Sequence, residues 1–452
     1  MDYRTNIFGG AVVARRAILR AGLALPLVSA CGVLSGDERK VRIAVPWSGF
    51  ELSAFRKVLR DREIEGAVEL LPLGDDIGIA LGARGRSAPD IVLLPEAGRV
   101  AELAEEGLRP LDESLWVDAD GWRYAPEWQQ LLWRNGRPYG VPFKAANKSL
   151  VWYDRYAFGK EPGDEPRSWT LSEWPQRMEE DFSGPDRPNL LALGAADGWV
   201  LANMFENVLF DVSLWENGTP WDYQDLAGPG GGVRWTRQWD RDAVRATLTV
   251  LGRIWGNKFA FPGGVAATLT RQYPDAVRDV FEHRRAAMVV APDFAEPVVR
   301  RSLARAGRPA DAVGVMRFPP AVPGGHRPLI AGGDVIVLTA GAKSAATQVV
   351  SALADPAAPL TWIRDNGGFL APNRRTPIRS SELLRALEPT AWIDSWTEFD
   401  LADLVGTVGR RDGLWRILTE FLIAVGDGKV DRLREQTERA VAALARFERK
   451  TP

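Results

Sequence analysis

The sequence is poor in the side chains that most often carry covalent or metal chemistry. Its 452 residues include one cysteine, Cys31, and two histidines, His283 and His326. A single cysteine excludes a disulfide framework within the chain. The two histidines are far apart and neither has a partner at ligand spacing, so a zinc site or a histidine-based triad is poorly supported. We therefore expect no metal, no cofactor and no catalytic residue.

An excess of charge of one sign is also lacking. The formal net charge is −2, with 46% hydrophobic and 26% charged residues. No global field favours nucleic acid or an anionic membrane, so we expect no nucleic-acid partner. The composition is that of an ordinary globular protein, and the length is sufficient for two domains.

The N-terminal segment carries a short apolar run, from Ala21 to Ala30, that is too short to span a bilayer. It follows Arg15, Arg16 and Arg20 and ends in small residues, a pattern typical of a secretory signal. We expect residues 1–30 to be a signal peptide. The paired arginines resemble a twin-arginine signal, although Ala14 replaces the usual polar residue, so the general export route stays open.

Cys31 ends the stretch VSAC, which resembles a bacterial lipobox. In such a motif the cysteine thiol takes a diacylglycerol, and several acyl chains hold a protein on the membrane surface. The alternative is a plain signal with a chance cysteine. The position of the only cysteine, directly after the apolar run, favours lipidation. We expect a lipoprotein on the outer face of the cell membrane, with residues 31–40 as a polar tether.

Tryptophan is abundant, since 18 tryptophans outnumber the seven tyrosines. An indole offers a flat apolar face and one N–H donor, and the C–H face of a sugar ring stacks well on it. Most of these rings are expected in the core, and a few are expected to line a sugar site.

The first half of the fold is predicted to be a parallel sheet. Residues 41–45 alternate as a strand, 50–60 have helical spacing, and 68–73 form a second strand, which together make a βαβ unit. Residues 89–95 form a buried third strand. Ligands bind beyond the carboxyl ends of such strands, where Trp47, Ser48 and Glu96 lie.

The stretch from Gly140 to Asp154 combines a buried strand with unusual charge. Leu150 to Tyr153 is β-branched and aromatic, as expected for a core strand. Lys144, Asn147 and Lys148 precede it, where a chain would pass into a core. Buried ammonium groups are costly unless paired, so we expect both lysines at an edge or a cleft wall.

Within this stretch, KAANKSLVWYD resembles the first inter-lobe crossover of the family 1 extracellular solute-binding proteins of ABC sugar importers, and most closely their α-glucoside-binding branch. Further similar stretches are PDIVLLPEAGRVAELAEEGLRPLDE at 89–113, LIAGGDVIVL at 329–338 and GGFLAPN at 367–373. The resemblance covers nearly the whole chain.

The resemblance implies an α/β, two-lobe periplasmic-binding-protein-like fold of type II. Each lobe would be a mainly parallel sheet flanked by helices, with the ligand in the inter-lobe cleft. Residues 41–147 and 333–369 would form lobe 1, and residues 148–332 and 370–452 would form lobe 2. The implied function is that of a monomeric, non-catalytic receptor, which captures an α-glucoside or other oligosaccharide and delivers it to the transmembrane subunits of an ABC permease.

The resemblance also implies site residues. Asp293 and Phe294 follow the strand AAMVV, and Trp199 lies in a DGW turn that faces the cleft in the resembled branch. Trp199 is either a stacking platform or a buried residue that closes a helix start. Asp334 either bonds sugar hydroxyls or pairs with Lys144 or Lys148. The full set of expected ligand-binding residues is Trp47, Ser48, Glu96, Lys144, Asn147, Lys148, Trp199, Asp293, Phe294, Gly333, Asp334 and Phe369.

Two other functions stay open at this point. A glycoside hydrolase needs two carboxylates facing one bond, and no motif places a pair among Asp90, Glu96, Asp293 and Asp334. A cell-envelope carbohydrate-binding lipoprotein without a transport role is the other. The glycine run at 228–232 lacks a following GK[ST], so it is not a phosphate loop. It lies in an insert at 215–232 that departs from the family pattern and could cover the cleft.

Overall fold

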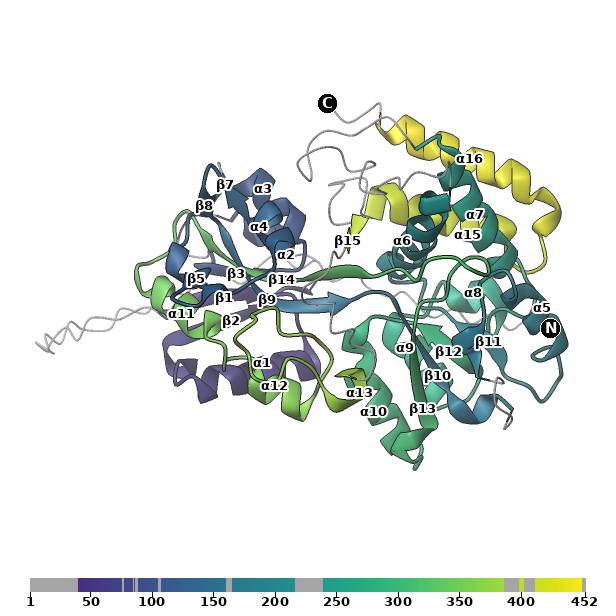
Figure 1. The fold of residues 1–452 in the computed structure, drawn as a ribbon, viewed down its shortest axis with the longest axis horizontal. Coiled ribbons are helices and arrows are strands. Elements are labelled where there is room, and N and C mark those ends of the chain that lie inside the picture. The colour runs from purple at the N-terminus through teal and green to yellow at the C-terminus, as the bar shows by residue number, and fades with distance from the viewer. Residues whose placement is uncertain are drawn as a thin grey trace, which may run out of the picture. The chain divides into compact units, whose positions relative to one another are not determined.

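The computed structural model describes residues 40–74, 77–83, 85, 88–104, 107–159, 165–215, 239–385, 398–401 and 411–448 (Figure 1). The expected signal peptide at 1–30, Cys31, the tether up to residue 39 and positions 216–232 of the insert lie outside these ranges. In the part of the chain that the structure describes, no helix has both the length and the apolar character needed to cross a membrane.

The larger sheet has seven strands in the order β15-β14-β3-β1-β2, and β4 and β9 also pair with β14. Strands β1 and β2 are parallel in register from Val41 opposite Val68, and β1 and β3 are parallel as well, which confirms the predicted βαβ unit. Strand β14 is parallel to β15 but antiparallel to β3, β4 and β9, so the larger sheet as a whole is mixed and not mainly parallel as expected. The strands are β1 Val41–Val45, β2 Val68–Pro72, β3 Ile91–Leu94, β4 Leu108–Arg109, β9 Gly140–Asn147, β14 Ile330–Thr339 and β15 Glu398–Phe399.

The smaller sheet has four strands in the order β11-β12-β10-β13. Only β11 and β12 are parallel, whereas β10 is antiparallel to both β12 and β13. The expectation of two mainly parallel sheets is therefore wrong for this sheet. The reason is that β10 follows β9 after two residues, so it enters the sheet directly from the other sheet and not through a crossover helix. The strands are β10 Leu150–Asp154, β11 Asn189–Ala192, β12 Ala286–Val290 and β13 Val313–Arg317.

Two further two-stranded ribbons and the helices complete the described fold. The ribbons are β5 Val117–Asp118 with β6 Gly121–Trp122, and β7 Trp133–Arg134 with β8 Arg137–Pro138. The α-helices are α1 Gly49–Asp61, α2 Ile77–Ala80, α3 Val100–Leu103, α4 Pro126–Leu132, α5 Trp174–Glu180, α6 Gly198–Trp215, α7 Asp242–Trp255, α8 Gly264–Thr268, α9 Tyr273–Phe281, α10 Glu296–Arg305, α11 Ala345–Ala354, α12 Leu360–Asp365, α13 Glu382–Arg385, α15 Arg416–Val425 and α16 Leu433–Glu448.

The helices bury the apolar stripes that their sequences predict. In α1, Phe55, Val58 and Leu59 are fully buried against the larger sheet's core, because they recur at helical spacing. Phe50, in the first turn of α1, packs instead against a second core cluster, which contains Val298 of α10. Elements of both sheets therefore meet at the N-terminal turn of α1.

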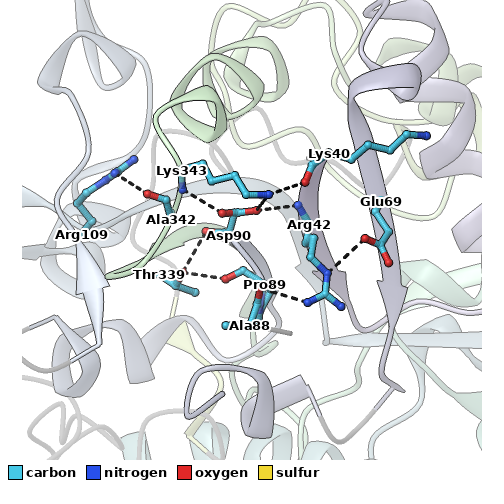
Figure 2. A network of polar contacts seen from close by, with 10 residues as sticks. All are labelled: Lys40, Arg42, Glu69, Ala88, Pro89, Asp90, Arg109, Thr339, Ala342 and Lys343. Atoms are coloured by element: carbon cyan, nitrogen blue, oxygen red, sulfur yellow. Dashed lines mark hydrogen bonds and ion pairs between the residues drawn. The ribbon is translucent and has the colours of Figure 1, made fainter. Parts of the chain in front are cut away.

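Asp90 ties three strands of the larger sheet together (Figure 2). Its carboxylate is 4% exposed and accepts the backbone N–H groups of Arg42 and Lys343 at 2.9 Å each. The Lys343 ammonium lies 3.4 Å from the same carboxylate, and Thr339 donates to the backbone of Pro89 and Asp90. Charge-assisted bonds of this kind are structural, so Asp90 is engaged in holding β1, β3 and β14 in place.

Candidate functional site

Lys144 lies at the centre of a buried charge cluster. It is 5% exposed in β9, and its ammonium lies 2.9 Å from a carboxylate oxygen of Glu51 and 3.7 Å from one of Asp334. Burial alone would lower the pKa of Lys144, but the carboxylates of Glu51 and Asp334 outweigh burial and raise it. The ammonium therefore stays charged. Of the two expected positions for Lys144, an exposed edge is wrong, because the side chain is buried and carboxylate partners compensate its burial, and a cleft wall stays a prediction.

Three aromatic rings surround the same ammonium. The Lys144 nitrogen lies 5.2 Å from the ring centre of Trp47, 4.8 Å from that of Trp362 and 5.4 Å from that of Phe369. All three distances are within the range of cation–π attraction. The Trp47 indole also donates to Asp334 at 3.1 Å and packs edge-on against Trp362 at 5.0 Å. Lys144, Glu51, Asp334, Trp47, Trp362 and Phe369 are called the lysine cage below.

The lysine cage depends on the pairing of β9 with β14. In this antiparallel pair, Asp334 lies opposite Lys144, and the register shifts between Asp334 and Val335. Of the two interpretations of Asp334, pairing with Lys144 is confirmed by the 3.7 Å contact. Burial raises the pKa of Asp334, although the Lys144 charge opposes this effect. A glycine is required at position 333, next to Asp334, because a Cβ at this position would lie 1.9 Å from the Lys144 carbonyl oxygen.

Asp293 is a buried carboxyl next to the lysine cage. It is 3% exposed, and one carboxyl oxygen accepts the backbone N–H of Asn147 at 2.9 Å. Its other oxygen, Oδ1, is buried and has no hydrogen-bond partner among the described residues. Burial raises the pKa of Asp293 to about 8, despite the backbone N–H groups of Asn147 and Phe294 and the charge of Lys144, which all lower it. A hydroxyl group of a ligand is the kind of partner that this oxygen lacks.

The raised pKa of Asp293 predicts a pH-dependent stability. In the unfolded chain the carboxyl ionises near its ordinary pKa of about 3.9, whereas in the folded protein it holds its proton up to pH about 8. The contribution of the Asp293 carboxyl to the free energy of unfolding is therefore fully present below about pH 4, and it is lost as the pH rises to about 8. Urea denaturation measures this effect. Over this pH window the free energy of unfolding of the wild type should fall, relative to that of Asp293→Asn, by up to about 1.4 kcal/mol per pH unit.

Asp293→Asn isolates the effect of Asp293 on the pH dependence of stability. The amide does not titrate, and Asp334 and Lys144 are present in both proteins. Parallel pH profiles of the two proteins between pH 5 and 8 would contradict a raised pKa at Asp293.

An aromatic trio includes Phe294, the residue that follows Asp293. The rings of Trp199, Tyr273 and Phe294 are 5.4 to 5.6 Å apart, centre to centre. Each is partly exposed, so Trp199 is not a fully buried residue at a helix start. Burial raises the pKa of Tyr273, and the nearby charge of Glu51 adds to this rise. Glu51 thus acts electrostatically on both Lys144 and the aromatic trio.

The other expected site residues lie apart from the lysine cage or make other contacts. Ser48 is exposed at the N-cap of α1 and makes no side-chain capping bond. Glu96 pairs with Arg99 at 3.0 Å, and its backbone bridges Gly333. Lys148 forms an ion pair with Asp400, where the two side chains are 15% and 8% exposed. Lys148 is therefore half-buried and paired, and its expected place at an edge or a cleft wall stays a prediction.

Sequence reasoning missed several residues of this region. Glu51 follows Trp47 and Ser48 by one helical turn, and an acid in a first helical turn was the available signal. Trp362 and Asp400 lie far along the chain, where no local pattern marks them as neighbours of Lys144 and Lys148. Within the described ranges, no group of three histidine, cysteine or acidic side chains could hold a metal ion.

Known binding proteins are similar in sequence to part of this chain. No family model matches the chain. The osmoprotective compounds-binding protein GgtB of Synechocystis sp. is 26% identical over 43% of this chain and 44% of its own length. The alpha-glucosides-binding periplasmic protein AglE of Rhizobium meliloti is 25% identical over 52% and 51%. The resemblance to the family 1 solute-binding proteins is confirmed. The chain spans about half the length of these curated relatives.

Solved structures of solute-binding proteins share the fold over most of the chain. The maltose/maltodextrin-binding domain MalE from Bdellovibrio bacteriovorus, bound to maltotriose, has a TM-score of 0.62 at 17% identity, with 91% of this chain and 100% of that one covered. The GacH receptor of Streptomyces glaucescens has a TM-score of 0.64 at 16% identity, with 91% and 99% covered. The predicted two-lobe α/β fold is therefore confirmed.

Proposed function

We propose that this protein is the extracytoplasmic substrate-binding component of an ABC importer and that it captures a carbohydrate. The observation that carries the proposal is the buried Oδ1 of Asp293, which has no hydrogen-bond partner within the described ranges, together with the lysine cage and the partly exposed aromatic trio. Sugars present apolar C–H faces and many hydroxyl groups, so they need aromatic platforms and convergent hydrogen-bonding groups in one place.

The ligand class that we favour is an α-glucoside or other oligosaccharide, which is bound between the two lobes. Support comes from the name of the relative AglE and from the local resemblance of the stretch around Lys144. The protein would deliver its ligand to the transmembrane subunits of a permease. We further propose that it acts as a monomer and that Cys31 anchors it to the outer face of the cell membrane.

Binding without catalysis is the second part of the proposal. Of the four acids considered for a hydrolase, Asp90 is engaged with Arg42 and Lys343, and Glu96 pairs with Arg99. Asp334 accepts the indole N–H of Trp47 and faces Lys144. A hydrolase needs a free pair of carboxylates on the two sides of one bond, and these contacts disfavour it.

The stacking role of Trp199 gives a direct test. Trp199→Ala should weaken the affinity for the bound sugar at least about tenfold, equal to about 1.4 kcal/mol, because it removes one stacking face. Calorimetric titration of wild type and variant with maltose, trehalose, sucrose and raffinose measures this change. Trp122→Ala is the matched control, since Trp122 is 43% exposed and lies in the ribbon β5–β6, away from the trio. Equal losses of sugar affinity in Trp199→Ala and Trp122→Ala would contradict the stacking role of Trp199.

A further inference from the structure

Glu296, at the start of α10, is a fully buried carboxylate to which the proposed function gives no role. One oxygen, Oε2, accepts the backbone N–H of Gly368 at 3.0 Å and the hydroxyl of Ser381 at 2.7 Å. The other oxygen, Oε1, accepts two N–H groups of Arg300, at 2.8 and 2.5 Å. Because the side chain is fully buried and both oxygens are bonded, Glu296 does not itself contact a ligand.

The bonds of Glu296 fix residues 367–370, which are called the glycine segment below. Gly367 and Gly368 have φ angles of 66° and 84°, in the left-handed region that favours glycine. A Cβ at Gly367 would lie 2.3 Å from Oε2 of Glu296. A Cβ at Gly368 would lie 2.9 Å from the Pro297 side chain and 3.3 Å from the Phe294 Cα. The glycine segment therefore lies directly against residues 294–297.

The glycine segment also carries one ring of the lysine cage. The ring centre of Phe369 lies 5.4 Å from the ammonium nitrogen of Lys144. The next residue, Leu370, exchanges two backbone hydrogen bonds of 2.9 Å with Ala145 of β9. The segment is thus held to the larger sheet on one side and to α10, through Glu296, on the other.

The same turn of the chain holds β9 as well. Asp293, three residues before Glu296, accepts the backbone N–H of Asn147, the last residue of β9. Two carboxylates of one short stretch therefore bind the backbone of two separate stretches, and each of these stretches carries a residue of the lysine cage. Hydrogen bonds to a carboxylate are strong and directional, so they fix the distance between the groups that they join.

We propose that Glu296 is a positioning residue of the sugar site, which holds the glycine segment against residues 293–297 and so sets the place of the Phe369 ring relative to Asp293. The proposal rests on the carbohydrate-binding function proposed above. Glu296 acts through Phe369 and Asp293 and not through a contact with the sugar.

Shortening the Glu296 side chain tests whether its reach is needed. Glu296→Asp keeps the charge but is one methylene shorter, so it no longer reaches both Gly368 and Ser381. In calorimetric titration of the full chain with maltose, trehalose, sucrose and raffinose, it should bind about tenfold more weakly than wild type, near the value of one hydrogen bond to a charged group. Glu282→Asp is the matched control and should bind as wild type, since Glu282 lies at the end of α9 and pairs with Arg305 of α10 at 3.8 Å.

The pH dependence of stability gives a readout that a loss of packing alone would not move. Burial is the largest cause that raises the pKa of Asp293, and the charge of Glu296 adds to the rise, while that of Lys144 opposes it. Glu296→Gln keeps the length of the side chain and removes its charge, so Asp293 should ionise at a lower pH. Urea denaturation of Glu296→Gln and of the double variant Asp293→Asn/Glu296→Gln measures this shift. The difference between their free energies of unfolding should be lost at a lower pH than the difference between wild type and Asp293→Asn.

The outcomes separate this role from the carbohydrate-binding function. Wild-type affinity in Glu296→Asp would overturn the positioning role and leave sugar binding standing, and so would an unchanged pH profile in the Glu296→Gln background. If Glu296→Asp does not fold, Ser381→Ala decides, because it removes one donor and leaves the carboxylate in place. Ser381→Ala should weaken the affinity about fivefold, and wild-type affinity in this variant would overturn the role. Absence of wild-type binding to every sugar in the panel would overturn both proposals.

Discussion

Replacing Lys144 with methionine is expected to lower the free energy of unfolding by about 3 to 5 kcal/mol, the usual cost of removing one partner of a buried ion pair. Methionine keeps the length of the side chain but removes the charge. Glu51 and Asp334 would then face each other's negative charge without the ammonium that lies 2.9 Å and 3.7 Å from them. Urea denaturation measures the loss.

The matched control for this prediction is Lys57→Met. Lys57 also forms an ion pair, with Asp365, but the two side chains are 47% and 43% exposed. Exposed pairs contribute about 0 to 1 kcal/mol, so this variant should be close to wild type. The double variant Lys144→Met/Asp334→Asn should recover part of the stability, because one of the unpaired carboxylates is gone. If Lys144→Met lost as little free energy of unfolding as Lys57→Met, the buried ion pairs of the lysine cage would be contradicted.

Replacing Gly333 with alanine is expected to destabilise the protein by about 3 kcal/mol or more, at the upper end of the cost of overpacking. The added Cβ would lie 1.9 Å from the Lys144 carbonyl oxygen and 2.9 Å from the Ala145 Cα. Both are backbone atoms of a paired strand, so neither can rotate away. The variant should also weaken sugar binding, because β9 carries Lys144 and Asn147.

Gly341→Ala provides the control for this substitution. Gly341 lies just after β14, and a Cβ there would meet no atom within 4 Å. The free energy of unfolding of Gly341→Ala should differ from that of the wild type by less than about 0.5 kcal/mol. Thermal unfolding of both variants is sufficient to compare them. A wild-type Tm for Gly333→Ala would mean that β9 and β14 are not held as close as the pairing requires.

Periodicity in the sequence was sufficient to predict the elements that build the fold. Residues 41–45 and 286–290 form the two predicted strands with the predicted bounds. Local patterns carry this information because one face of each element is buried, and burial imposes a period of 2 or 3.6 residues. The direction of β10 could not be predicted in this way, since it depends on how the chain passes between the sheets.

The candidate site could be predicted only in part. The loop after the first strand led to Trp47, the family resemblance implied Asp293 and Phe294, and the unusual lysines of the crossover led to Lys144. Their partners Trp362 and Asp400 come from distant parts of the chain, and a single sequence has no signal for such pairs. The pairing of Asp334 with Lys144 depends on a strand register with a shift at that position, which residue patterns do not determine.

Helix α6 shows a second limit of sequence reasoning. Its apolar residues Leu201, Phe205 and Val208 recur at helical spacing, whereas no pattern in the sequence marks Asn203 and Asn207 as buried. Only the packing of α6 against the crossover shows that Asn203 and Asn207 are buried.

The most direct test of the account is thermal unfolding of the protein with a panel of mono- and oligosaccharides, combined with an assay for released monosaccharide. A sugar present at 100 times its Kd should add about 2.7 kcal/mol of stability and raise Tm, without any turnover. The account predicts such a rise with at least one α-glucoside or related oligosaccharide. Release of monosaccharide, or an unchanged Tm with every sugar, would contradict it.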